Sequence, residues 1–186
     1  MGMPLQKMSL EEFLGWENTQ AERHEFHRGE VFLMEGARRT HGTVIANLAR
    51  HLGNHLAGSK FRVFSEGMKV QIADDTIFYP DVFVTCDAED LRTDMIFRSP
   101  ILVVEVLSPS TVAYDRSRKF ALYRRLASLQ EYLLVDPDTR RVEAFRRNDQ
   151  DLWVLHDMSE SESLEVACLE ARVPMSQVFD GVDPAE

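Results

Sequence analysis

The sequence contains little cysteine and no long apolar run. Cys86 and Cys168 are the only cysteines among 186 residues, and neither forms a CxxC motif or a Cys/His grouping at zinc-ligand spacing. These absences argue against a disulfide-framed secreted domain and a zinc ribbon. The longest apolar run, residues 101–104, is far shorter than the ~20 residues of a membrane span, and the N-terminus has no stretch resembling a signal peptide. The protein is therefore expected to be cytoplasmic, without membrane contact.

Several common catalytic motifs are also missing. The chain has no GxSxG motif, no P-loop and no GxGxxG motif, which argues against serine hydrolases, NTPases and dinucleotide-dependent enzymes. It also has no internal repeat, low-complexity segment or linker. With 44% hydrophobic and 28% charged residues, the composition predicts one globular domain that spans residues 1–186 and buries a full core.

The charge is negative overall but unevenly distributed. The 21 basic and 31 acidic residues give a net charge of −10, which alone argues against a nucleic-acid partner. Residues 149–186 account for −9 of this charge, whereas residues 110–148 hold nine basic and only five acidic residues. Two interpretations of that basic region stay open: a nucleic-acid contact, or the solvated faces of a helix and a hairpin.

Hydrophobic periodicity predicts helices and strands that alternate along the chain. Ser9 and Glu12 have capping-box spacing, which predicts a first helix from residue 9 into the early twenties. Further helices are expected over 41–56, 115–126 and 175–179, and strands over 31–34, 62–72, 77–85, 101–107, 131–135, 141–146, 153–156 and 164–166. Gly67 is expected to interrupt the second of these strands. This order predicts an α/β fold with a mixed central sheet flanked by helices.

A carboxylate stands where a buried apolar residue is expected. Glu105 interrupts the apolar strand 101–107, and a buried ionised carboxylate without a partner is costly. One explanation is a salt bridge to an arginine of the following helix. The other is a divalent metal shared with Asp81, which follows a proline turn at the start of a strand. Two hard oxygen ligands with room for water and a phosphate oxygen suit Mg²⁺.

A lysine occupies the core-facing stripe of the next helix. Lys119 has the i, i+3, i+4, i+7 spacing with Leu122, Tyr123 and Leu126. In one interpretation its stem lies on the core and its ammonium pairs with Asp115, one turn earlier. In the other, the ammonium points at the two carboxylates, where it holds the attacking water and stabilises the charge of the transition state.

Several segments of the chain resemble a bacterial protein family. They are YPDVFV (79–84), ILVVEVLSPST (101–111), DRSRKFALY (115–123) and EYLLVDPD (131–138), with HEFHRGEVFLM (24–34) and the helix starting at His41 upstream. In this order they resemble the "putative restriction endonuclease" family of the PD-(D/E)XK nuclease superfamily, over nearly the whole chain. The resemblance implies a restriction-endonuclease-like core, a Mg²⁺- or Mn²⁺-dependent site for phosphodiester hydrolysis, and a homodimer.

The resemblance also implies roles for individual residues. Asp81 matches the PD aspartate and Glu105 the second acid, so both would bind the metal, together with the backbone carbonyl of Val106. The superfamily pattern ExK places a lysine at position 107, where this chain has Leu107. Lys119 matches the place to which the narrower family has moved that lysine, and would be the catalytic lysine.

Two further residues match family positions. Glu25 would be an outer metal ligand or would orient the water, unless it is a solvated carboxylate at a helix end. His41 would donate to a phosphate near the N-terminus of the second helix, where the helix dipole favours anions, or would only cap that helix. His24 and His27 are expected at the surface.

Two functions from different classes follow. The first is a metal-dependent DNA endonuclease, in which Asp81 and Glu105 hold Mg²⁺ or Mn²⁺ and Lys119 positions the attacking water. The second is a nuclease-fold protein that does not cut and acts as a DNA-binding or dimerising module. Because all three residues are present, the sequence favours the enzyme, a Mg²⁺-dependent endodeoxyribonuclease whose partner is DNA.

Overall fold

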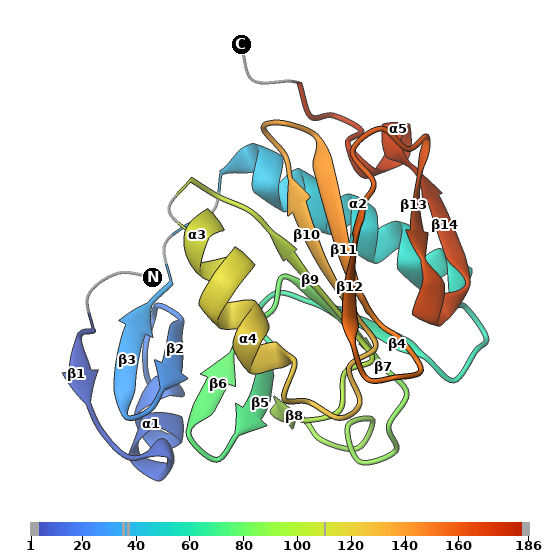
Figure 1. Cartoon of the computed structure of the whole chain (residues 1–186). Coiled ribbons are helices and arrows are strands. Elements are labelled where there is room, and N and C mark those ends of the chain that lie inside the picture. The colour runs from blue at the N-terminus through green and yellow to red at the C-terminus, as the bar shows by residue number, and fades with distance from the viewer. Residues whose placement is uncertain (1–3, 35, 37, 110, 184–186) are drawn as a thin grey trace.

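The computed structural model describes residues 4–34, 36, 38–109 and 111–183, whose strands form two six-stranded sheets and a separate hairpin (Figure 1). The first sheet, in spatial order, is β1 Gln6–Lys7, β3 Glu30–Leu33, β2 His24–His27, β6 Thr76–Phe78, β5 Lys69–Ala73 and β8 Ile96–Phe97. The second sheet is β12 Trp153–Asp157, β11 Arg141–Arg147, β10 Glu131–Asp136, β9 Leu102–Val106, β7 Val82–Thr85 and β4 Arg62–Ser65. The hairpin is β13 Ser163–Val166 and β14 Ala171–Pro174.

Helices cover both faces of the second sheet (Figure 1). α2 (Arg39–His55) packs on one face, and a helical segment over residues 112–123 packs on the other. This segment consists of α3 (Val112–Tyr114), the π-helical turn η1 (Asp115–Lys119) and α4 (Phe120–Tyr123). The remaining helical elements are α1 Leu10–Glu17, the 3-10 turn η2 Ala167–Leu169 and α5 Met175–Val178. No helix in the described ranges is long and apolar enough to cross a bilayer.

The central strand β9 is buried on both faces, as its apolar sequence predicts. Leu102 and Val104 lie in the core beneath α2, whereas Val103 lies in the core beneath α4. Parallel pairing with β10 and antiparallel pairing with β7 enclose both edges of the strand. Glu105 follows Val103 by two residues, so its side chain points toward the helical segment 112–123.

A long bent hairpin connects the two sheets. Its first arm is β4 and β5 and its second is β6 and β7, with β4 paired to β7 in one sheet and β5 to β6 in the other. The first arm bends at Glu66 and Gly67, whose φ angles are 43° and 71°, which confirms Gly67 as a break between two strands. The second arm bends at residues 79–81, where the Asp81 carbonyl accepts the Glu66 N–H at 3.1 Å. Asp81 therefore lies where the two sheets meet.

The predicted class, a mixed α/β fold with helices flanking the sheet, is confirmed, although the bent hairpin divides the strands between two sheets. The capping box is also confirmed, but the first helix is shorter than expected and ends at Glu17. The surface position expected for His24 and His27 is wrong. The His24 ring lies 3.0 Å from the Glu17 carboxylate, the His27 ring lies 2.9 Å from the Thr76 hydroxyl, and both histidines are buried.

Asp90 organises the loop between β7 and β9. Its buried carboxylate accepts hydrogen bonds from the Thr85 hydroxyl at 3.0 Å and from the N–H groups of Arg98 and Ser99 at 2.7 and 2.9 Å. Asp90→Ala is expected to lower the free energy of unfolding by about 1–3 kcal/mol, because buried donors lose their acceptor. Urea denaturation measures the loss, and a transition identical to that of the wild type would contradict this role.

Candidate active site

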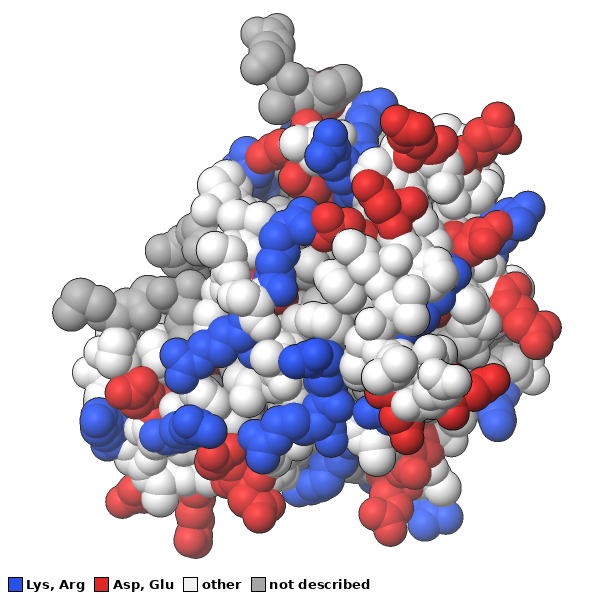
Figure 2. Space-filling view, in the orientation of Figure 1, with Lys and Arg blue, Asp and Glu red and all other residues white. Residues whose placement is uncertain are grey.

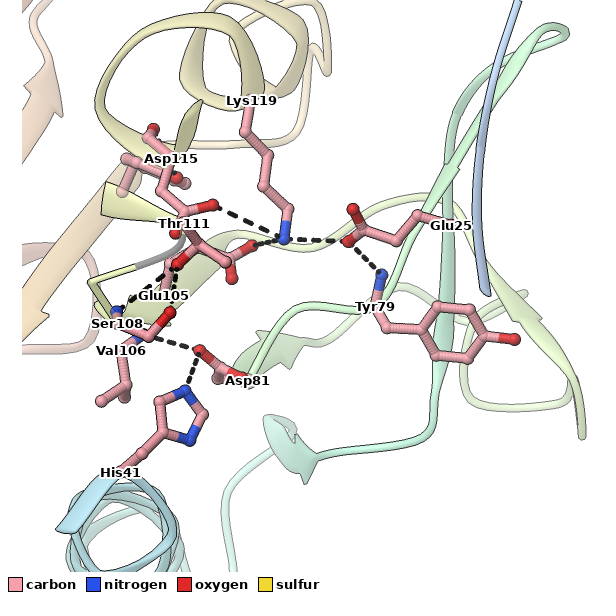
Figure 3. Close-up of polar contacts among 11 residues, drawn as sticks. Glu25, His41, Tyr79, Asp81, Glu105, Val106, Ser108, Thr111, Asp115 and Lys119 are labelled. Atoms are coloured by element: carbon pink, nitrogen blue, oxygen red, sulfur yellow. Dashed lines mark hydrogen bonds and ion pairs between the residues drawn. The ribbon is translucent and has the colours of Figure 1, made fainter. Parts of the chain in front are cut away.

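A cavity of about 380 Å³ lies where the two sheets meet, between the helical segment 112–123 and the start of α2. Apolar residues of β3 and the loop after β9 form part of its wall. The charged and histidine side chains that line it are Glu25, Arg38, His41, Asp81, Glu105, Asp115 and Lys119. Four carboxylates therefore share one cavity, and most of these side chains converge on each other in Figure 3.

Glu105 lies in the middle of this charged group and is only 3% exposed. Its Oε1 lies 3.0 Å from the Lys119 ammonium, but it accepts no well-directed hydrogen bond within the described part of the chain. Burial raises the pKa of Glu105 well above its ordinary value; Lys119 opposes the rise, and the charges of Asp81 and Asp115 add to it. A further cation in the cavity would stabilise the ionised form of this carboxylate.

Asp81 is held against the end of β9 by the bend of the hairpin. Its Oδ2 accepts the Val106 N–H at 2.7 Å and lies 3.4 Å from His41 Nε2 (Figure 3). Both contacts use the same oxygen, which leaves Oδ1 for another ligand. The N–H and C=O of one strand residue point to the same side, so the Val106 carbonyl faces this gap as well. The structure thus brings Asp81, Glu105 and the Val106 carbonyl to one cavity wall.

The π-helical turn carries Lys119 into the carboxylates. Its Nζ lies 2.9 Å from Glu25, 3.0 Å from Glu105 and 3.9 Å from Asp115 (Figure 3). Burial acts to lower the pKa of Lys119, but the three carboxylates outweigh it and raise that pKa well above its ordinary value. The ammonium therefore stays charged. A π-turn adds one residue to a helix and occurs frequently at functional sites.

These contacts decide several alternatives that the sequence left open. The first of the two explanations for Glu105, a salt bridge to an arginine, is wrong, because its partner on the following helical segment is Lys119. The pair between Lys119 and Asp115 exists, but it is the longest of the three contacts that the lysine makes. Glu25 is neither solvated nor at a helix end: it lies in β2 and is 8% exposed. Asp115 is a cavity residue that the sequence considered only as a partner of the lysine.

His41 lies in the first turn of α2 without capping it. The N-cap is Arg38, and no side chain caps this helix end. Burial acts to lower the pKa of His41, but Asp81 and a hydrogen bond with the Val106 backbone raise it above its ordinary value. Its Nδ1 is buried and has no hydrogen-bond partner among the residues described. His41 therefore orients Asp81, whereas a contact with phosphate stays a prediction.

A buried polar network supports the bend that carries Asp81, and sequence reasoning missed it. Tyr79 donates its hydroxyl to Glu17 at 2.9 Å and its N–H to Glu25 at 3.5 Å. Glu17 also accepts the backbone N–H of His24 at 3.0 Å. The network thereby ties α1 to the bend and to the cavity. Its members are far apart in the sequence, so no local pattern reveals it.

The donor atoms of the cavity are of the kind that binds a hard cation. The described parts of the chain hold no group of three or more His, Cys, Asp or Glu side chains arranged to bind a metal ion. The candidate ligands are two carboxylates and one backbone carbonyl, so they include only two such side chains and do not form a group of that size. Mg²⁺ in proteins is usually bound through one or two carboxylates, with waters and substrate phosphate completing its shell. The residues present therefore fit Mg²⁺ or Mn²⁺.

The chain is similar to a described family and to several individual proteins. A family described as "Putative restriction endonuclease" matches residues 10–176. Two proteins of Synechocystis sp., both described as uncharacterized, are similar over most of their length. One is 36% identical over 96% of this chain and 95% of its own, and the other is 33% identical over 85% and 92%.

A solved structure has the same fold. It is the crystal structure of a protein from Anabaena variabilis described as a "putative nuclease". The two structures superpose with a TM-score of 0.80 over 95% of this chain and 99% of the other, although only 17% of the residues are identical. The two proteins thus share one fold.

Proposed function

Because the chain belongs to the family described as "Putative restriction endonuclease", we propose that it is a Mg²⁺- or Mn²⁺-dependent endonuclease that hydrolyses phosphodiester bonds of DNA. One observation carries the proposal. The buried Lys119 ammonium lies 3.0 Å from Glu105 in a cavity that Asp81 also lines, and the three side chains come from different elements. A fold that needed only stability would not gather four carboxylates in one cavity with one lysine, because their mutual repulsion is costly.

The residues of the cavity would have different roles in hydrolysis. Asp81, Glu105 and the Val106 carbonyl would hold the metal, which when bound acts as a Lewis acid and lowers the pKa of a bound water. Lys119 would hold the attacking water and stabilise the negative charge that develops on the phosphoryl oxygens. Glu25 keeps the ammonium in place from the opposite side of the cavity, at 2.9 Å.

A cleavage assay on plasmid and oligonucleotide DNA tests the proposal. The wild-type protein is expected to cut only with Mg²⁺ or Mn²⁺, and the double variant Asp81→Ala, Glu105→Ala is expected not to cut. A folded wild-type protein that binds DNA without cutting under any of these conditions would support the second hypothesis, a DNA-binding or dimerising module. We also propose a homodimer, since a two-fold pair of sites would cut both strands.

Metal binding is expected to raise the melting temperature. A ligand that binds only the folded state stabilises it by about 2.7 kcal/mol at 100 times its Kd. Asp81→Asn should lose this shift, and the exposed Asp149→Asn should keep it. Because the pKa of Glu105 is raised, protons compete with the metal, and the shift should grow as the pH rises. Scanning fluorimetry measures the shift, and an equal shift in Asp81→Asn would contradict the assignment.

A further inference from the structure

The helical segment that carries Lys119 into the cavity presents a second group of charges to solvent. Its acidic residue Asp115 is buried beside the lysine, so the outer face of the segment and of the turn after it has no carboxylate of its own. Basic side chains gather over this part of the molecule in Figure 2. The exposed residues that contribute to it are Arg116, Arg118, Arg124 and Arg125.

Little of this positive charge is compensated. Arg116 pairs with Glu143 of β11, and Arg124 lies over the Phe120 ring. In the described ranges, no ion pair joins Arg118 or Arg125 to a carboxylate. Exposed helices usually alternate their charges so that opposite signs meet one turn apart. An uncompensated group of like charges is typical of a surface that binds a polyanion.

Arg118 connects this surface to the cavity. It follows Tyr114, a residue of the cavity wall, by about one turn. Burial lowers the pKa of His27, and the charges of Arg118 and Arg28 lower it further, so Arg118 lies near the first sheet as well; Arg28 itself pairs with Asp75 at 3.7 Å. Arg125 is exposed like Arg118 and lies in the turn directly after α4, seven residues further along the chain.

We propose that Arg118 and Arg125, here called the arginine strip, bind the sugar–phosphate backbone of the nucleic acid as it leaves the cavity. The inference rests on the proposed function and adds the path of the substrate to it. Guanidinium groups match phosphate oxygens in a bidentate geometry, which an ammonium does not. Because the strip begins at the rim of the cavity, a nucleic-acid strand can place its scissile phosphate inside the cavity and its neighbouring phosphates on the strip. Binding to a lipid surface or to an acidic protein would not require the strip to adjoin the cavity.

Binding of a labelled oligonucleotide in EDTA separates this inference from catalysis, because no cleavage occurs. Arg118→Gln, Arg125→Gln is the test variant. Arg141→Gln, Arg172→Gln removes the same charge from exposed positions elsewhere and is the matched control. The test variant is expected to bind roughly tenfold more weakly or worse, and the slope of log K against log salt should fall by about 2, one per lost phosphate contact. The control should bind like the wild type.

The outcomes distinguish the two proposals. Equal binding by the test and control variants overturns the arginine strip even if the wild type cleaves DNA, and so does a wild type that binds no DNA. Selective loss of binding in the test variant supports the strip, whether or not the wild type cleaves DNA; failure of cleavage counts only against the proposed function. Arginine-dependent binding to vesicles of anionic lipid, without binding to DNA, would also overturn the strip.

Discussion

Replacing Lys119 by methionine is expected to lower the rate of DNA cleavage by about 10²-fold or more, because the variant keeps the stem of the side chain and removes the charge that holds water and stabilises the transition state. The rate is measured under single-turnover conditions at saturating metal. Lys69→Met is the matched control, since Lys69 is a second buried lysine that bonds Asn18 at 3.1 Å outside the cavity. Unchanged cleavage by Lys119→Met would mean that another group holds the water.

The same variant is also expected to lose stability. Its carboxylate partners would stay buried without their cation, which costs about 3–5 kcal/mol when a buried pair is broken. The pKa of Glu105, already raised by burial above its ordinary 4.5, would rise further. The folded variant would then bind protons more tightly than the unfolded chain, so its stability should increase as the pH falls toward that ordinary value. Urea denaturation across pH tests this sign.

If Glu105 binds the metal as proposed, Glu105→Gln is expected to reduce metal-dependent cleavage by about 10³-fold, since loss of a metal ligand removes several kcal/mol of charge stabilisation. Its free energy of unfolding should stay equal or rise. Lys119 would still contact Glu25 at 2.9 Å and Asp115 at 3.9 Å, and one of four repelling carboxylates would be gone.

Glu131→Gln is a control for which the opposite effects are expected, a loss of stability with unchanged cleavage. Glu131 is a buried carboxylate of β10, the neighbouring strand, and its Oε1 accepts the Arg146 Nε–H at 2.8 Å. Breaking this pair should destabilise the protein by about 3–5 kcal/mol and leave cleavage per folded molecule unchanged. If Glu105→Gln unfolded the protein instead, the salt bridge to Lys119 would be a structural requirement and the catalytic assignment would lose its main support.

Local patterns predicted most of the individual elements. The apolar spacing of α2 predicts a helix, and the apolar run of β9, interrupted only by Glu105, predicts a strand buried on both faces; both occur. The strand β2 was missed because its sequence HEFH has only one apolar residue, Phe26. Its polar side chains are buried through tertiary partners such as Glu17 and Thr76, which no local pattern contains.

The division of the strands into two sheets depends on bends of the backbone, which the composition of the strands does not reveal. The sequence predicts extended stretches over 62–72, with a break at Gly67, and over 77–85, but only the bends at Glu66–Gly67 and at 79–81 assign their halves to different sheets. A similar limit applies to the site. Glu105 is visible in the sequence because it is a carboxylate in an apolar strand, whereas the role of Asp115 depends on a π-turn that periodicity of 3.6 residues does not reveal.

The π-turn at Asp115–Lys119 also affects how such a site can be gained or lost during evolution. Deleting one residue within this turn would restore an ordinary α-helix, because the π-turn accommodates one extra residue, and the helical residues on either side would keep their register. The helix would still form, and Phe120 and Tyr123 would keep their places in the core. The side chains of the turn itself, which include Asp115 and Lys119, would shift relative to the carboxylates of the two sheets. A lineage could therefore switch the cavity off, or acquire it, by a single-codon change in length, without replacing any of the acidic residues.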